Sequence, residues 1–437
     1  DGQADFLMNV VFYTLGCKVN QYETQIMREL LQKNGFIEDG SKPADVVIIN
    51  SCTVTAESDR KTRQALNRFK NHNPNAVTVL AGCYPQALFE KGLELPAGAD
   101  ILLGNANTPH LVELIEEFKR EKKPINALKN HTKTDGLSIL TRGSFEGKTR
   151  AFVKIEDGCN RFCSYCMVPY ARGRVRSKPI EEIKKELSML SFSGCKEVVL
   201  SGINLTAYSD EGRDLGDAVT AAATIPGIER IRLGSMEPDQ LTPEIIEKLK
   251  DASKLCGQFH LSLQSGCDET LIRMRRRYDT AFYEELVKRL RASFPDCSIT
   301  TDIMVGFPLE SDEEFESSLA FVKRIGFARA HVFAYSPRKD TPAASMSGQI
   351  TRHDKEKRSK IMTAATDLSA GEFIKNAKGK VSDVLFEKEL YPGVFEGYTE
   401  NYIQVKVKSD TDISGQIFPV SIGDMDISDG YTSAEIV

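Results

Sequence analysis

The chain has 437 residues, of which 41% are hydrophobic and 27% charged, the composition of an ordinary globular protein. At roughly 100–200 residues per domain, this length predicts two to four domains. The net charge of −5 argues against a generally basic surface, so a nucleic-acid partner would have to use local basic patches. No apolar stretch approaches the roughly 18 residues of a membrane span, and no signal peptide is recognised. The 10 cysteines are therefore expected to be thiols or metal ligands in a cytoplasmic protein.

Residues 8–125 alternate between strand and helix patterns. Short apolar runs separated by helices predict a doubly wound parallel sheet with helices on both faces. The predicted helices cover residues 20–33 and 58–71, and the predicted strands cover residues 9–14, 45–50, 77–81 and 100–103.

Three cysteines of this segment, Cys17, Cys52 and Cys83, each follow a predicted strand. The carboxyl ends of parallel strands lie on one edge of a sheet, where ligands bind. Strands are about 4.8 Å apart, so three neighbouring strands would bring the thiols within roughly 10 Å of one another. A [4Fe–4S] cluster normally takes four thiolates, and a site with three leaves one iron free for another ligand.

Residues 126–149 are polar and predict a linker, and residues 150–350 resume the strand–helix alternation. Six strand–helix units predict an open, partial (β/α)6 barrel, whose chemistry belongs at the carboxyl ends of the strands. The predicted strands are 151–155, 197–200, 230–233, 260–263, 298–303 and 331–334. A second set of cysteines, Cys159, Cys163 and Cys166, lies in the loop after the first of these strands.

The last part of the chain changes its period. Residues 351–378 predict one charged connecting helix. Residues 379–437 alternate as about five short strands, which predicts a small antiparallel β-barrel of OB-like size. Asp and Glu outnumber Lys and Arg in this barrel, so whether it binds RNA stays open.

The spacing CxxxCxxC, with Tyr165 before the last cysteine, resembles the radical S-adenosylmethionine (SAM) superfamily. The resemblance implies a [4Fe–4S] cluster on three thiolates, SAM chelated at the fourth iron, and reductive cleavage of SAM to a 5′-deoxyadenosyl radical. The alternative is zinc, but zinc takes four closed ligands and no fourth partner is near in sequence. Candidate SAM contacts at the strand ends, each also explicable as a turn or cap residue, are Tyr165, Ser201, Gly202, Asn204, Ser235, Glu237, Gln264 and Asp302.

With both cysteine sets considered, the chain from about residue 9 to 437 resembles the radical SAM methylthiotransferases, which have an N-terminal three-cysteine domain and a C-terminal TRAM barrel. The resemblance implies an auxiliary [4Fe–4S] cluster on Cys17, Cys52 and Cys83. It also implies that SAM is used twice, as methyl donor and as radical source.

The sequence around the first cysteine, Gly16-Cys17-Lys18-Val19-Asn20, looks like the subfamily that methylthiolates C2 of N6-threonylcarbamoyladenosine (t6A) at position 37 of tRNA. The isopentenyladenosine subfamily usually has Gly-Cys-Gln-Met-Asn here, and the ribosomal protein S12 subfamily Gly-Cys-Pro-Lys-Asn. Both of these substrates remain alternatives. A different radical SAM reaction and a non-catalytic, zinc-dependent RNA-binding protein are further ones.

The partners implied by the resemblance are a tRNA anticodon stem-loop bearing t6A, a low-potential electron donor such as flavodoxin, and a sulfide source. Arginine forks suit both phosphate and carboxylate groups. Candidates for contact with RNA or with the t6A carboxylate, each of which would otherwise be part of a solvated face, are Arg172, Arg174, Arg176 and Arg277.

Overall fold

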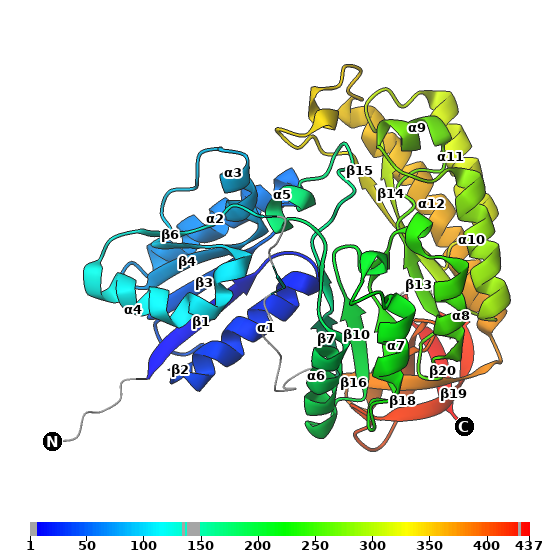
Figure 1. Ribbon diagram of the computed structural model, residues 1–437. Helices are drawn as coiled ribbons and strands as arrows, with labels where there is room; N and C mark the ends of the chain where they lie inside the picture. The colour runs from blue at the N-terminus through cyan, green and yellow to red at the C-terminus, as the bar shows by residue number, and fades with distance from the viewer. Residues whose placement is uncertain (1–6, 133–135, 138–148, 427–429) are drawn as a thin grey trace.

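The computed structural model describes residues 7–132, 136–137, 149–426 and 430–437. Figure 1 shows a sheet with flanking helices at the N-terminal end, a half-open barrel of parallel strands beside it, and a small β-barrel at the C-terminal end. Within these ranges no helix combines the length and apolar character that crossing a membrane requires.

The N-terminal sheet has the parallel order β2-β1-β3-β4-β5-β6. Its central strand β3 is buried on both faces, because Val46 and Ile48 face one apolar cluster and Val47 and Ile49 face another. The predicted doubly wound sheet is therefore confirmed. Its elements are β1 (Met8–Thr14), α1 (Lys18–Lys33), β2 (Phe36–Ile37), β3 (Val46–Ser51), α2 (Ala56–His72), β4 (Val77–Gly82), α3 (Cys83–Glu90), β5 (Ile101–Leu103), η1 (Asn105–His110), α4 (Leu111–Glu121) and β6 (Ile125–Ala127).

The sixth strand differs from the sequence-based expectation. β6 pairs in parallel with β5 at the point where the linker at residues 126–149 was predicted to begin. Three residues carry too little periodicity to be recognised as a strand. Most of the remaining predicted linker lies outside the described residues.

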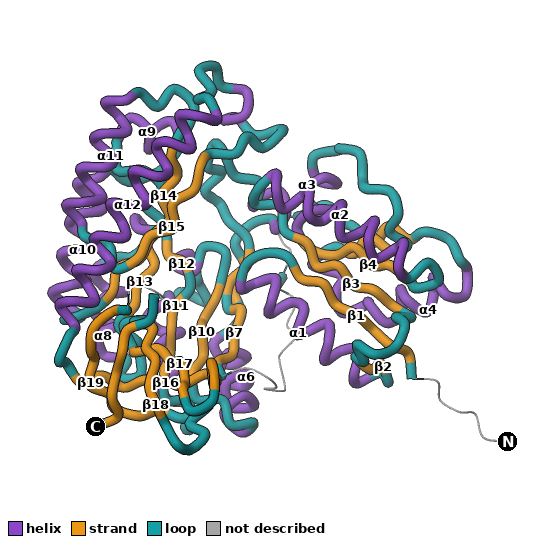
Figure 2. Tube along the Cα trace, turned by 180° about the vertical axis from the view of Figure 1, so that it is seen from behind, coloured by secondary structure: helices purple, strands orange, loops and turns teal. Residues whose placement is uncertain are grey.

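The central segment is an open barrel made of two parallel sheets, β11-β10-β7 and β12-β13-β14-β15. A bridge between Ile231 and Leu255 continues the first sheet toward the second. The helices lie on the outside, as Figure 2 shows from behind, and the partial barrel is confirmed. Its elements are β7 (Arg150–Lys154), β8 (Glu156–Asp157), α5 (Val168–Arg172), β9 (Arg176–Ser177), α6 (Ile180–Phe192), β10 (Glu197–Ser201), η2 (Leu205–Ala207), α7 (Leu215–Ala223), β11 (Arg230–Leu233), β12 (Ser235–Met236), η3 (Pro238–Gln240), α8 (Pro243–Asp251), β13 (Gln258–Leu261), α9 (Asp268–Arg273), α10 (Thr280–Ser293), β14 (Ser298–Val305), α11 (Asp312–Ile325), β15 (Arg329–Ala334) and η4 (Pro342–Ser345).

A long helix, α12 (Arg352–Ala377), leads to a closed β-barrel of order β16-β17-β18-β20-β19. Buried Phe386, Val405 and Val420 contribute to the barrel core. The predicted small barrel is confirmed, although β18 and β20 pair in parallel. Its strands are β16 (Val381–Tyr391), β17 (Val394–Thr399), β18 (Gln404–Lys408), β19 (Ile417–Met425) and β20 (Thr432–Ile436).

Two buried arginines attach this barrel to the amino ends of the central strands. Arg232 donates to the backbone oxygens of Thr399 (2.7 Å) and Glu400 (2.8 Å). Arg230 donates to the backbone oxygen of Tyr398 at 3.1 Å. The C-terminal barrel therefore covers the end of the central barrel opposite to the CxxxCxxC loop.

Candidate functional site

The three N-terminal cysteines lie at one edge of the sheet, because β1, β3 and β4 are consecutive neighbours. Cys17 immediately precedes α1, Cys52 follows β3, and Cys83 begins α3. Gly16 has a φ of +124°, and a Cβ there would lie 2.9 Å from the Cβ of Cys52. A glycine is therefore needed for the first two cysteine loops to approach each other.

Two asparagines that the sequence analysis did not single out connect these loops. Asn20 accepts a hydrogen bond from the Cys17 thiol, with a sulfur–oxygen distance of 3.4 Å. The Asn20 amide donates to Asn50 Oδ1 at 3.3 Å and to the Ser51 backbone oxygen at 3.1 Å. Asn50 returns a bond of 2.9 Å to the Asn20 backbone oxygen. The loop after β1 is thus tied to the end of β3.

The second cysteine set lies in the loop that follows β8. Cys163 is buried, and Cys159 and Cys166 are partly buried. Tyr165 packs edge-on against Phe307, with ring centroids 6.3 Å apart. The Cys163 sulfur accepts a hydrogen bond of 3.4 Å from Arg276 Nη1.

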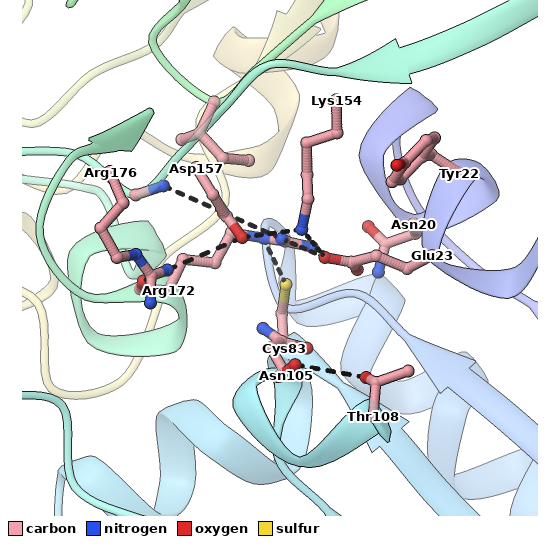
Figure 3. A network of polar contacts seen from close by, with 12 residues as sticks. Asn20, Tyr22, Glu23, Cys83, Asn105, Thr108, Lys154, Asp157, Arg172 and Arg176 are labelled. Carbon is pink, nitrogen blue, oxygen red and sulfur yellow. Dashed lines mark hydrogen bonds and ion pairs between the residues drawn. The ribbon is translucent and has the colours of Figure 1, made fainter. Parts of the chain in front are cut away.

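The two cysteine sets belong to adjoining parts of the molecule. Cys83 and Ala87 of the first domain form one apolar cluster with Met167, which directly follows Cys166, and with Ala171 of α5. Arg172, at the end of α5, donates from Nε to the Cys83 sulfur at 3.1 Å. Figure 3 shows this contact within a larger network of charges.

The network around Arg172 joins the N-terminal domain to the central barrel. The guanidinium contacts both carboxylate oxygens of Glu23, at 2.8 and 3.0 Å, and Asp157 Oδ1 at 3.1 Å. Lys154 contacts the same two acids, at 2.8 Å for Glu23 and 3.0 Å for Asp157. Arg176 adds a third cation, 3.7 Å from Asp157 Oδ2, so three cations surround two anions in a buried place.

This environment sets Arg172 apart from the other arginines that the sequence offers as candidates for contact with RNA or the t6A carboxylate. Arg172 is only 1% exposed, and its guanidinium is occupied by Cys83, Glu23 and Asp157. Arg176 also points inward, donating to the Arg172 backbone oxygen at 2.6 Å. The two remaining candidates, Arg174 and Arg277, are exposed, with the Arg174 guanidinium 4.9 Å from the centre of the Phe162 ring.

The glycine segment after β10 wraps around a buried carboxylate. The backbone amides of Ile203 and Asn204 both donate to Glu156 Oε2 at 2.7 Å. A Cβ at Gly202 would lie 2.6 Å from the same oxygen. Burial raises the pKa of Glu156 to about 8, because few compensating charges surround it. Ser201, in the same segment, donates to the Val199 backbone oxygen at 3.3 Å.

The other candidate SAM contacts lie at the carboxyl ends of the following strands. Glu237 forms an ion pair with Arg276 at 2.8 Å, and Gln264, in a left-handed conformation with φ of 67°, donates its backbone amide to the Asp302 carbonyl. Burial alone would raise the pKa of Asp302, but the hydrogen bond and charge of His260 bring it below the usual range. Ser235 is exposed on this edge. The structure thus brings these residues to one edge of the barrel.

The donor chemistry of both cysteine sets fits an iron–sulfur cluster with three protein ligands. Among the residues described, no group of three or more His, Cys, Asp and Glu side chains gathers around a point that one metal ion could occupy. In a cubane each thiolate binds a different iron, so convergence on one point is not required. Burial raises the pKa values of Cys83 and Cys159 to about 12, so these thiols must release protons when they ligate metal.

Comparisons with known proteins agree with these features. Residues 153–322 match the radical SAM superfamily, and residues 9–104 match Uncharacterized protein family UPF0004. A protein of Bacillus subtilis named threonylcarbamoyladenosine tRNA methylthiotransferase MtaB is 36% identical, with 95% of this chain and 94% of that protein covered. The protein of that name from Thermotoga maritima is 37% identical over 90% of this chain and 89% of its own length.

Further matches extend the comparison. A tRNA-2-methylthio-N(6)-dimethylallyladenosine synthase of Lachnoclostridium phytofermentans is 33% identical over 94% of this chain and 92% of its own length. Among solved structures, the radical SAM methyltransferase TsrM of Kitasatospora setae shares the fold, with a TM-score of 0.57 at 14% identity, covering 91% of this chain and 82% of TsrM.

The fold and the cysteine loop therefore define a radical SAM enzyme, a class whose cofactors are SAM and a [4Fe–4S] cluster. Within that class, the family of this chain follows from two relatives that are 36% and 37% identical and that match it over nearly their full length. The chain belongs to the tRNA methylthiotransferase family.

Arg172 provides a first test of the site. Replacing it in Arg172→Gln leaves Glu23 with Lys154 alone and Asp157 with Lys154 and Arg176, in a buried place. Breaking such a buried pair costs about 3–5 kcal/mol, so we expect the free energy of unfolding in urea to fall by about that amount. The matched control Arg174→Gln, two residues away and exposed, should change it by less than about 0.5 kcal/mol. Equal effects of the two substitutions would contradict the assigned network.

Glu156 provides a pH-dependent test. Its pKa of about 8 exceeds the ordinary value of 4.5, so between these pH values the folded state holds a proton that the unfolded state has lost. The stability that protonated Glu156 contributes is therefore present at low pH, and it is lost as the pH rises through this interval. Glu156→Gln should lose less thermal stability than the wild type between about pH 5.5 and 8.5, measured as the difference in Tm. The exposed control Glu116→Gln should behave as the wild type, and identical pH profiles for all three proteins would refute the assignment.

Proposed function

We propose that this enzyme attaches a methylthio group to C2 of t6A at position 37 of tRNA, giving 2-methylthio-t6A. The observation that carries the proposal is the junction at which Cys83 of the first cysteine set contacts Arg172, six residues after Cys166 of the second. A reaction that joins sulfur to a carbon radical requires both centres to reach one substrate.

In this proposal Cys159, Cys163 and Cys166 hold the SAM cluster, and Cys17, Cys52 and Cys83 hold a second [4Fe–4S] cluster. When bound, these groups would supply the electron for SAM cleavage and an open iron that carries sulfur. The protein's own contribution is to orient the reactants, to exclude water and to compensate charge.

Charge compensation falls to two buried arginines. Arg172 donates to Cys83 and Arg276 donates to Cys163, so each cysteine set has one guanidinium against a sulfur. Hydrogen bonds to charged sulfur lower the cost of holding thiolates away from water. We propose these two residues as positioning groups for the clusters.

SAM itself would lie along the carboxyl ends of the central strands. We propose that it contacts Tyr165, the segment Ser201–Asn204 and the side chains of Ser235, Glu237, Gln264 and Asp302. Tyr165 is held against Phe307, and Asp302 is oriented by His260 at 3.3 Å. Pre-oriented groups of this kind reduce the entropy cost of bringing SAM and substrate together.

The choice of t6A rests on the first-cysteine motif and on the names of relatives. Relatives at 36% and 37% identity are named for t6A, and two relatives named for dimethylallyladenosine are 33% and 36% identical, so the motif carries most of this choice. A low-potential electron donor such as flavodoxin, a sulfide source and a cytoplasmic location are part of the same proposal.

A variant that lacks three cysteines tests whether the two cysteine sets have separate roles. Cys17→Ala, Cys52→Ala and Cys83→Ala together should leave about four of about eight irons, because each cubane carries four. Reductive cleavage of SAM to 5′-deoxyadenosine should persist, while methylthiolation is lost. The control Cys297→Ala, a buried cysteine outside both sets, should keep all irons and the activity. Full methylthiolation by the triple variant would refute the role of the first set.

The substrate is tested separately. The chain is expressed in a bacterial strain that lacks its own tRNA methylthiotransferases, and the tRNA nucleosides are analysed by mass spectrometry. We expect 2-methylthio-t6A to appear and isopentenyladenosine to remain unmodified. The reverse pattern would favour the isopentenyladenosine alternative.

A further inference from the structure

A cavity of about 380 Å³ lies between the amino ends of the central strands, the start of α1 and the C-terminal barrel. Its volume is within the range of small-ligand sites. The walls come from all three parts of the molecule: Lys18 from the N-terminal domain, Arg150 and Arg232 from β7 and β11, and Tyr402 from the C-terminal barrel. Figure 1 shows β16 and β18 beneath β7 and β10 at this end of the central barrel.

The lining of the cavity has an excess of positive charge. Four basic side chains, Lys18, Arg150, Arg232 and Lys388, face one acidic side chain, Glu387. Glu387 accepts a hydrogen bond of 2.7 Å from Arg150 Nε. The nearest additional acid is buried Glu197, which is shared by Arg150 at 3.5 Å, Arg230 at 3.0 Å and Arg232 at 2.8 Å.

Lys18 differs from the other cations of the cavity. Lys388 pairs with Glu396 at 3.2 Å, and both arginines have acidic partners. In the described part of the chain, no hydrogen bond or ion pair occupies the Lys18 ammonium, and its side chain is accessible from the cavity. An unpaired cation beside two arginines favours an anionic ligand.

Aromatic and amide groups complete the lining. The rings of Tyr398 and Tyr402 lie 4.8 Å apart, and Phe152 lies on the same wall. Gln21 and Gln258 add hydrogen-bonding amides. Such a combination suits a ligand that has a planar, hydrogen-bonding portion and an acidic end.

We propose that Lys18, supported by Arg150 and Arg232, binds the threonyl carboxylate of t6A and so selects this nucleoside. The inference rests on the proposed function and adds the residues that recognise the substrate. Lys18 directly follows Cys17, so a nucleoside anchored here by its acidic arm would keep its adenine close to the first cysteine set.

The same charges would act against an apolar substrate. An isopentenyl group in this cavity would cover the Lys18 ammonium without supplying a counter-ion, and unpaired buried charge is costly. The cavity thereby combines attraction to one modified adenosine with rejection of another.

The test measures binding to anticodon stem-loops by the iron-loaded, full-length protein. One stem-loop carries t6A, and the second carries the same group with its carboxylate converted to a neutral carboxamide. Because a hydrogen bond to a charged group contributes about 1.5–3 kcal/mol, the wild type should bind the carboxylate form at least about tenfold more tightly. Lys18→Gln should lose most of this preference, and Lys18→Arg should retain it.

Controls separate recognition from damage to the fold. Lys33→Gln removes the same charge from the exposed end of the same helix and should retain the wild-type preference. Iron content and SAM cleavage without RNA, measured for every variant, should match the wild type, because Lys18 is assigned to substrate and not to either cluster.

Three outcomes would overturn the inference. A carboxylate preference that survives in Lys18→Gln removes Lys18 from recognition. Equal weakening of both stem-loops by Lys18→Gln assigns the cavity to an RNA phosphate. A wild type that binds the two stem-loops equally leaves no carboxylate site. In each case the nucleoside analysis by mass spectrometry still decides the proposed reaction independently.

Discussion

The structure depends on one buried guanidinium that belongs to both halves of the site. Arg172 reaches from the end of α5 to Cys83 and Glu23 in the N-terminal domain, while its remaining bond to Asp157 stays within the central barrel. A buried charge pair adds little net stability, but removing one partner is costly. The arrangement therefore acts mainly by fixing geometry, because Arg172 and Lys154 each contact Glu23 of one domain and Asp157 of the other. The relative position of the two domains also sets how the two cysteine sets face each other.

The two ends of the central barrel serve different purposes. Its carboxyl ends carry the CxxxCxxC loop and the polar residues from Ser201 to Asp302, in keeping with the usual location of chemistry in such folds. Its amino ends are closed by the C-terminal barrel through backbone contacts of Arg230 and Arg232. Those two arginines share Glu197 with Arg150, so three cations surround one acid at this position. The excess of positive charge therefore lies inside the barrel and not on its surface. An acidic C-terminal barrel can thus form part of a basic cavity, because the charge is supplied by the strands that it covers.

Much of this architecture could be predicted from the sequence, and the failures have identifiable causes. Period and spacing predicted the parallel sheet, the half barrel and the terminal barrel, and strands followed by Cys17, Cys52 and Cys83 predicted a shared edge. Strand order could only be assumed, since the apolar pattern of a single sequence does not reveal which strands pair. Basic runs in the sequence show where charge gathers, but they do not show which side chain points into the protein. Arg276 contacts Cys163, while Arg277, the neighbour chosen from the sequence, is exposed. One residue of difference at the end of a short helix reverses which side chain points inward, and only packing determines that. Asn20 ends the motif of the first cysteine, but neither it nor Asn50 could be assigned a contact, because a buried amide network has no characteristic spacing.

The three N-terminal cysteines differ in their exposure to solvent. Cys52 and Cys83 are buried, and Cys83 is closed off by Arg172 and the apolar contact with Met167 and Ala171. Cys17 is exposed, and the side chain that follows it enters the cavity beneath the central barrel. Of the first cysteine set, Cys17 is thus the one that a substrate would meet from outside. Lys18 and the tyrosines of the C-terminal barrel lie beside it, so the proposed recognition of the acidic arm and the exposed thiol would be neighbours.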